Sequence, residues 1–317
     1  MTAVGVADGV RRDSRFRATW AGVRNFWRRF SRRRDGVLGL AILIFFVVLA
    51  AFPEQLVGAL QTAVTATGPR LAPPGGGFLL GTDELGRDIV NLTVHGARIS
   101  MVIGLLATLV TVAIGVLIGI VSGFIGGRVD GILMRITDFF LVIPTFVLAL
   151  ILTPIIRDVV GSATTEVFGI RMTLIVIVVV IGITSWSSTA RIIRAQTLSI
   201  KERAFVDRAR VVGAGPFHIM RVHILPNVVN LIVANAVLTF AGAVLTETTL
   251  SFVGLGDPFQ PSWGQLLDAA RSVGAPGLGA WWYFAPPGLG IILVVFAFTL
   301  FGSALDDVLN PRRGGRR

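Results

Sequence analysis

The sequence predicts an all-α membrane protein with six transmembrane helices, on the evidence of its composition, its long apolar segments and the positions of its arginines. Of the 317 residues, 53% are hydrophobic and only 15% are charged, and the mean hydropathy is +0.77. A soluble globular chain carries about 25% charged residues. The composition therefore favours a chain that lies mostly in lipid, where helices pair every backbone group within one segment.

Six segments are long and apolar enough to cross the hydrocarbon core of a bilayer, which takes about 20 residues of helix. Most of them carry no charged side chain from end to end. The predicted membrane helices are residues 36–52, 99–127, 139–156, 172–190, 228–246 and 283–304.

The distribution of positive charge predicts how these helices are oriented. The chain has 29 Lys and Arg residues and a net charge of +11. Most of these residues fall on one side of the membrane if the N-terminus is placed inside, and basic residues mark the cytoplasmic side. Both termini are therefore expected in the cytoplasm. The basic N-terminal arm is expected to contact membrane lipid and to have no role in binding nucleic acid.

Four regions follow from this reading. Residues 1–34 are predicted to form a basic cytoplasmic arm, and residues 35–97 to form the first transmembrane helix and an outer segment. Residues 98–310 are predicted to form a core transmembrane domain with a charged loop at 191–227, and residues 311–317 a basic cytoplasmic tail. The arm lacks a short apolar core followed by a cleavage site. No cleaved signal peptide is expected, so the first helix serves as the insertion signal.

Several chemistries are excluded by residue types. The chain has no cysteine, which excludes disulfides, thiolate chemistry and cysteine metal sites. The three histidines, His95, His218 and His223, are divided between the two sides of the membrane, so no metal site is expected. No Ser/His/Asp cluster, HExxH or GxSxG pattern is present, and no catalytic residue is assigned.

The most informative segment is the elbow, which we define as residues 201–230 (KERAFVDRARVVGAGPFHIMRVHILPNVVN). Gly213 is predicted to end one short helix and Pro216 to begin a second. The expected apolar face of the first helix is Ala204, Phe205, Ala209 and Val212; that of the second is Phe217, Ile219, Met220 and Ile224. A break is expected at residues 225–227. Such an elbow suits the groove of a partner protein, and a plain connector is the alternative.

The elbow also resembles a known motif. Asp207-Arg208-Ala209, followed by Gly213 and by Leu225-Pro226, is similar to the EAA loop of ABC importer membrane subunits. Asp207 stands where that motif has Glu, Arg208 where it has Ala, and His223 where it has Ile. Three other segments resemble the C-type permease of dipeptide and oligopeptide importers: GTDELGRDIVNLTVHGARIS at 81–100, LTETTLSFVGLGDPFQPSWGQLL at 245–267 and LDDVLNPRRG near the end of the chain.

The resemblance implies a type I ABC importer permease fold in a bacterial cell membrane. It implies import of dipeptides or oligopeptides together with a second homologous permease subunit, two ATP-binding cassette subunits and an extracytoplasmic peptide-binding protein. The elbow would be the coupling helix that docks on an ATPase subunit. The residues expected to couple are Glu202, Phe205, Asp207, Ala209, Gly213, Ala214 and Pro216.

ATP hydrolysis is expected in the partner subunits. A phosphate-binding P-loop needs Gly-Lys-Ser/Thr, and the only lysine of this chain, Lys201, is followed by Glu202. No cofactor is therefore expected in this chain, and ATP and Mg²⁺ are expected in the ATPase subunits.

The outer segment carries a cluster of charged residues around Asp83, Gly86, Arg87 and Asp88. Paired carboxylates could indicate acid–base catalysis or a cation site. The favoured interpretation is a capped, salt-bridged entry into the second membrane helix, near the docking site of an external binding protein.

Polar residues inside the predicted membrane helices are candidates for the translocation path, because charge in lipid is costly and tends to face protein or water. These candidates are Asp138, Ser185, Asn235 and Glu247. Asp138 is also three residues after Arg135, which predicts an ion pair at the interface. Glu247 is interpreted as lining a pore or gate, and Ser185 and Asn235 fit helix–helix packing equally well.

Other functions stay open on the sequence alone. The same permease fold could import nickel, glutathione or another small solute. A self-sufficient secondary transporter would be expected to show inverted repeats or broken helices with charges at the midplane, and neither is visible. An intramembrane enzyme would need a catalytic set that the sequence does not offer.

Overall fold

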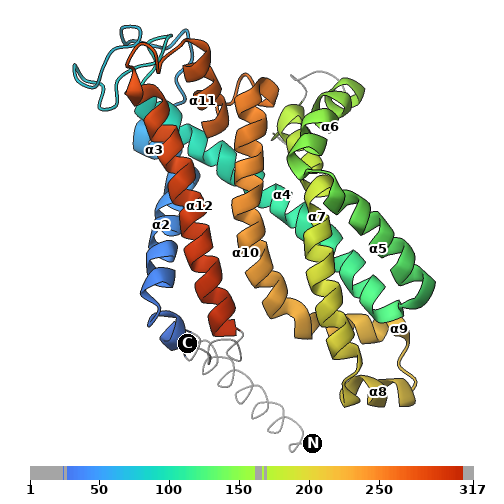
Figure 1. Cartoon of the computed structure of the whole chain (residues 1–317). Coiled ribbons are helices and arrows are strands. Elements are labelled where there is room, and N and C mark those ends of the chain that lie inside the picture. The colour runs from blue at the N-terminus through green and yellow to red at the C-terminus, as the bar shows by residue number, and fades with distance from the viewer. Residues whose placement is uncertain (1–23, 25–26, 161–165, 168–169, 310–317) are drawn as a thin grey trace, which may run out of the picture.

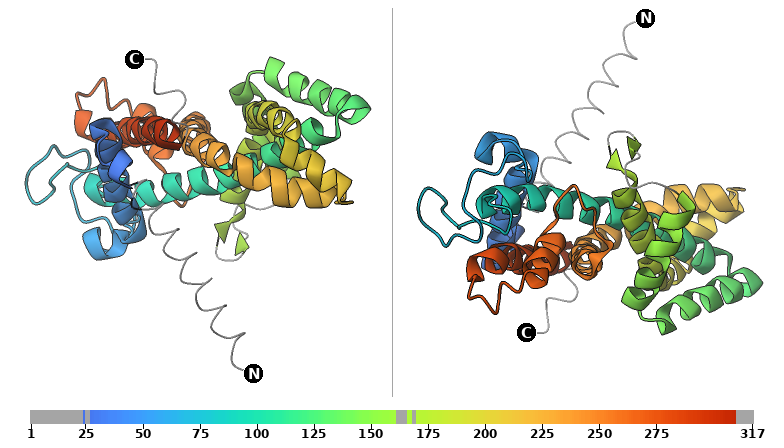
Figure 2. Two further views of the ribbon diagram at one scale, coloured as in Figure 1. Left: turned by 90° about the horizontal axis from the view of Figure 1, so that it is seen from below. Right: turned by 90° about the horizontal axis from the view of Figure 1, so that it is seen from above.

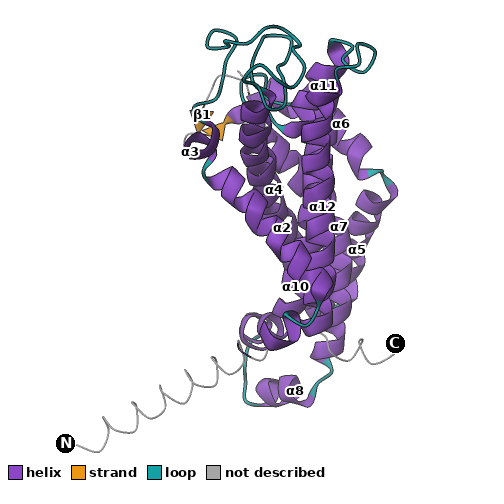
Figure 3. Cartoon of the chain, turned by 90° about the vertical axis from the view of Figure 1, so that its left-hand side faces the viewer, coloured by secondary structure: helices purple, strands orange, loops and turns teal. Residues whose placement is uncertain are grey.

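The computed structural model describes residues 24, 27–160, 166–167 and 170–309. Most of the described chain is helical (Figure 3). Its membrane-length helices are α2 (Arg34–Ala51), α4 (Ile89–Ile125), α7 (Met172–Lys201), α10 (Leu225–Leu250) and α12 (Trp281–Leu309). Its shorter elements are α3 (Pro53–Val57), α5 (Gly127–Val142), α6 (Thr145–Val160), α8 (Ala204–Val211), α9 (Pro216–His218), α11 (Trp263–Ser272), the π-helical segments η1 (Ile219–Ile224) and η2 (Ser251–Leu255), and the paired strands β1 (Glu166–Val167) and β2 (Ile170–Arg171). A long loop joins α3 to α4.

The prediction of six membrane crossings holds when one bent pair of helices is counted as a single span. Within the described residues, five helices are long and apolar enough to cross a membrane, and α5 with α6 form a sixth candidate bent by 92°. The single straight helix predicted at 139–156 is therefore wrong. Pro144 explains the bend, because the residue before a proline avoids helical angles, and Ile143 is extended at φ −80° and ψ 126°.

The second membrane helix begins ten residues earlier than predicted. α4 starts at Ile89 rather than at residue 99, because the Asp88 carboxylate caps its first turn by accepting the Val90 N–H at 2.8 Å. The predicted division between residues 97 and 98 therefore falls inside one continuous helix.

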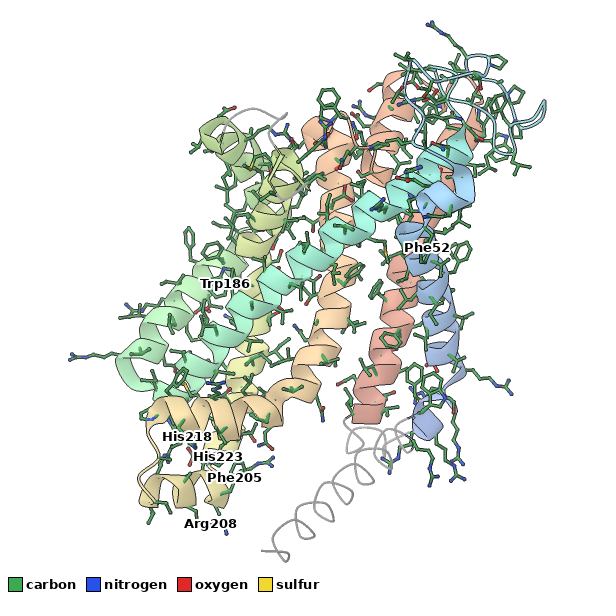
Figure 4. All side chains as sticks on the ribbon, turned by 180° about the vertical axis from the view of Figure 1, so that it is seen from behind. Phe52, Trp186, Phe205, Arg208, His218 and His223 are labelled. Atoms are coloured by element: carbon green, nitrogen blue, oxygen red, sulfur yellow. The ribbon has the colours of Figure 1, made fainter. Side chains whose placement is uncertain are left out.

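α4 runs obliquely across the bundle and packs along α7 (Figures 1 and 4). Glycines four residues apart allow the two helices to approach closely. A Cβ added to Gly115 would lie 2.6 Å from Thr189 Cβ, and one added to Gly123 would lie 2.8 Å from Thr197 Cβ. α2 packs against α12, and α10 contacts both α4 and α12, so the bundle is elongated when seen from either end (Figure 2).

The start of α2, the end of α12 and helix α8 lie at one end of the bundle, which we call the inner end (Figure 1). The long loop before α4 and helix α11 lie at the opposite, outer end. This arrangement agrees with an even number of crossings and with the cytoplasmic side predicted from the arginines.

Candidate functional site

The first half of the elbow is a short helix that ends in a glycine turn. After α8, the Gly213 N–H donates to the Arg210 carbonyl at 2.9 Å, and the Ala214 N–H donates to the Ala209 carbonyl at 3.0 Å. This is the Schellman pattern of a helix end. Gly213 has φ +87°, a conformation that costs glycine little. The predicted glycine turn is confirmed.

The second half of the elbow begins at Pro216, as predicted, but the predicted break at 225–227 is wrong. The helix runs on from α9 through η1 into α10. Pro226 has no N–H, and a proline ring crowds the carbonyl four residues earlier, here that of Val222. The chain accommodates it with π-type bonding, in which the Leu225 N–H donates to the Met220 carbonyl. The ribbon bends here while remaining helical (Figure 1).

The elbow is fixed to the membrane helices by an inner apolar cluster. Val206 of α8 is fully buried against side chains from α4, α7, η1 and α10, and these are Ile120, Phe124, Ile193, Ile200, Ile219, Ile224 and Val228. The predicted apolar face of α8 is therefore partly wrong. Phe205 and Ala209 are half-buried beside Val206, but Val212 lies beyond the helix end and is 87% exposed.

The tip of the elbow presents apolar side chains to solvent. Val211, Val212 and Phe217 are all strongly exposed. Between α8 and the second helix lies a hollow of about 690 Å³, lined by Phe205, Arg208, Ala209, Val212, Gly213, Ala214, Gly215, His218 and His223. Figure 4 shows Phe205, His218 and His223 facing this space from the two arms of the elbow. Exposed apolar groups around a hollow are typical of a protein-docking surface.

The charged residues of α8 are mostly paired within the helix. Asp207 accepts a hydrogen bond from Arg210 Nη1 at 3.0 Å, and Arg208 Nε donates to the Ala204 carbonyl at 3.3 Å. Both side chains of the Asp207–Arg210 pair remain open to solvent, as does Glu202. The predicted coupling residues therefore lie together on one exposed elbow.

A second set of charges, which sequence reasoning missed, joins the inner ends of the helices. Arg194 of α7 donates to both carboxylate oxygens of Asp130 in α5, each at 2.5 Å, and Ser122 also donates to Asp130. The Lys201 ammonium and the Arg210 guanidinium lie 5.9 and 5.8 Å from the centre of the Phe124 ring, within the range of cation–π attraction. These partners are distant in sequence, so no local pattern could reveal them.

Asp138 pairs with a residue other than the predicted one. Its carboxylate accepts a hydrogen bond from Arg191 Nη2 at 2.6 Å, rather than pairing with Arg135. Both partners are more than half exposed on the surface of the described chain.

The other three path candidates lie in different environments. Asn235 donates to Thr189 Oγ1 at 2.9 Å, which links α10 to α7, and Ser185 is half-buried. Glu247 is fully buried, where it accepts hydrogen bonds from Ser100 Oγ at 3.0 Å and Ser251 Oγ at 2.8 Å. Its carboxylate reaches no surface of the described chain in this conformation, and its role in a path stays a prediction. The bonds fasten α10 to α4 and η2.

The outer motif forms the capped, salt-bridged entry that the sequence predicted. The buried Asp83 accepts hydrogen bonds from the Leu85 and Arg87 N–H groups at 2.9 and 2.8 Å, and from Arg87 Nε at 2.6 Å. Gly86, at φ +80°, lies so close to the Gly68 carbonyl that a Cβ would approach it to 2.2 Å. The carboxylates of Asp83 and Asp88 are therefore occupied by structural hydrogen bonds.

These features define a multi-pass membrane protein with an exposed elbow at its inner end. A solved chain of the MetNI methionine ABC transporter, captured in an inward-facing conformation, shares this fold. The TM-score is 0.55 at 19% sequence identity, and the match covers 69% of this chain and 96% of that one.

Sequence comparison gives the family. Residues 115–315 match the family described as binding-protein-dependent transport system inner membrane component, and residues 23–74 match the N-terminal transmembrane domain of oligopeptide transport permease C. The dipeptide transport permease DppC of Escherichia coli (strain K12) is 35% identical over 297 residues, which cover 92% of this chain and 93% of that protein. DppC of Bacillus subtilis (strain 168) is 34% identical over 310 residues, covering 96% and 89%. The di/tripeptide permease DppC of Pseudomonas aeruginosa (strain UCBPP-PA14) is 34% identical over 92% of each chain.

The chain therefore belongs to the family of binding-protein-dependent transport system inner membrane components. It is the permease subunit of an ABC importer and a multi-pass protein of the inner membrane.

Proposed function

We propose that this permease imports dipeptides and short oligopeptides, and that the elbow couples transport to ATP hydrolysis in partner subunits. The peptide substrate follows from the relatives, which are named as dipeptide and di/tripeptide permeases. ATP and Mg²⁺ bind the two ATPase subunits, a second homologous permease completes the path, and a peptide-binding protein delivers substrate at the outer end.

The observation that carries the coupling role is the contrast between the two sides of α8. One side is fixed by the buried Val206 to a cluster that reaches α4, α7 and α10. The other side exposes Val211, Val212 and the hollow behind them. A partner protein bound to the exposed side of α8 can therefore move the membrane helices, because the buried side of α8 is packed in their cluster. Such a movement is a rigid-body transition between two states.

The test is uptake of a labelled dipeptide by cells that express the complete transporter and lack other peptide importers. Uptake should require the co-expressed ATPase subunits and ATP. Transport by this chain alone would overturn the importer assignment. Competition by dipeptides, but not by nickel or glutathione, would support the peptide substrate, and the reverse order would refute it.

Gly213→Asp tests the elbow itself. A Cβ added at Gly213 meets no atom of the described residues within 4 Å apart from its chain neighbours, so the variant should insert normally. A charged group there should block docking and uncouple uptake from ATP hydrolysis. Gly127→Asp is the matched control, because Gly127 also has positive φ, at +58°, and open space around it, but lies outside the elbow. Equal uptake by both variants would refute the docking role.

A further inference from the structure

We propose that an arginine patch at the inner end of α2 is a binding surface for anionic lipid headgroups. The patch consists of Arg28, Arg29, Arg32 and Arg34, all of them exposed. It is separate from the elbow, and the proposal does not depend on the identity of the transported substrate.

The segment that carries the patch is anchored to the bundle. Residues 27–30 are helical, and the Phe30 ring is 99% buried. Phe30 packs edge-to-face on Phe301 of α12, with ring centroids 5.6 Å apart, and stacks on Trp27 at 5.9 Å. A Cβ on Gly36 would lie 3.1 Å from this ring, so the absence of a side chain there makes room for it. The arginines are therefore held at a fixed place.

Ion pairs reinforce the anchor without neutralising the patch. Arg33 bonds to Asp307 of α12 and lies 3.6 Å from Asp35. The four patch arginines have no acidic partner within ion-pair distance among the described residues. Their charge is available to an anion from outside this part of the chain.

The patch lies at the depth of lipid headgroups. The exposed apolar side chains of α2 begin with Val37 and Leu38 and continue through Ile44 and Phe45. Arg34 precedes them by three to four residues, which is about 5 Å along a helix. Trp27 is 55% exposed beside the arginines, and indole rings favour this interface.

These observations identify the occupant by its chemistry. A guanidinium fork matches the oxygens of a phosphate, and several cations beside an apolar band match an anionic lipid with its acyl chains. A soluble phosphate compound would satisfy the arginines but not the apolar band or Trp27.

The experiment uses the assembled transporter in lipid nanodiscs, with cysteine-free partner subunits. Because this chain has no cysteine, Ser31→Cys introduces one labelling site next to the patch for a fluorophore. Phosphatidylglycerol and phosphatidylcholine, each with the same acyl-chain nitroxide, are compared as quenchers at equal mole fraction in the same unlabelled lipid mixture. Phosphatidylglycerol should quench more strongly.

Replacing Arg28, Arg29 and Arg32 by Gln in this background should lower the preference for phosphatidylglycerol at least fivefold, about the contribution of one cation near an anionic surface. Replacing the same three arginines by Lys should retain most of the preference for phosphatidylglycerol. Protease accessibility of a C-terminal tag checks that topology is unchanged. Equal quenching by the two lipids, or a preference that survives the Gln substitutions, would overturn the proposal. Loss of the preference on adding soluble phosphate would assign the patch to a soluble anion instead.

Discussion

Val206→Ala should detach α8 from the membrane helices while leaving its docking surface in place. Val206 is fully buried in the inner cluster. The substitution removes two carbon groups at about 0.8 kcal/mol each, and the cavity left behind adds to the loss. The total is about 2 kcal/mol, which increases the population of detached α8 roughly 30-fold.

Two measurements on the reconstituted transporter check this expectation. Hydrogen exchange of the α8 amides should become roughly 30-fold faster, because these amides exchange through local opening. The number of peptides imported per ATP hydrolysed should fall, while the ATPase subunits still co-purify with the permease.

Val212→Ala is the matched control, since it makes the same chemical change at a side chain that is 87% exposed. It should leave exchange in α8 unchanged and weaken association with the ATPase subunits instead. Unchanged exchange and unchanged coupling in Val206→Ala would refute the view that the inner cluster transmits movement from the elbow.

Three further predictions concern packing at the inner and outer ends. Asp130→Asn should lower the free energy of unfolding of the detergent-solubilised protein by about 1–3 kcal/mol, since it removes the charged partner of Arg194. The double variant with Arg194→Gln should lose less free energy of unfolding than the sum of the losses in the two single variants. Gly264→Ala should lower stability by about 1–3 kcal/mol or more, because a Cβ would lie 2.3 Å from the Thr248 carbonyl oxygen. Glu247→Leu should lower stability by about 1–3 kcal/mol, because it leaves buried hydroxyl groups without their acceptor, yet the order of preference among peptides should not change in uptake assays.

The controls for these variants are similar substitutions at positions that are exposed or have open space around them. Asp138→Asn removes the partner of Arg191 in a pair that is more than half exposed, and should change stability by less than about 1 kcal/mol. Gly131→Ala adds a Cβ that meets nothing within 4 Å and should be tolerated. A loss at these positions as large as at Asp130 and Gly264 would contradict the packing argument. A changed peptide preference in Glu247→Leu would return that residue to the translocation path.

Local chemistry made part of the elbow predictable. Gly213 and Pro216 act through backbone angles and a missing N–H, which depend on the residue itself, and the structure confirms both. The predicted break at Pro226 is wrong because the helix continues through a π-helical turn, which accommodates the proline and requires no special residue. The same reasoning could have found the bend at Pro144, which lies within a predicted membrane helix.

The burial and the pairing of several side chains could not be predicted, because they depend on residues that are distant in sequence. Val206 and Val212 have the same side chain, but of these two the structure buries only Val206, which lies in the inner cluster, while Val212 lies past the end of α8. Asp138 has Arg135 nearby in sequence but bonds Arg191, 53 residues away, across two helices. Glu247 is buried because Ser100 and Ser251 supply its hydrogen bonds. Only the Glu247–Ser251 bond, which joins residues four apart in sequence, follows from residue spacing.

The length of α4 connects the two ends of the molecule. Its 37 residues span about 55 Å at about 1.5 Å per residue. At its inner end, Phe124 lies in the cluster that holds Val206 of the elbow. At its outer end, Asp88 of the outer motif caps it. If movement of the elbow turned this helix by about 10°, simple leverage over its length would displace the outer end by about 10 Å. A displacement of that size is about the diameter of a helix, so we propose that movement of the elbow reaches the outer end through α4.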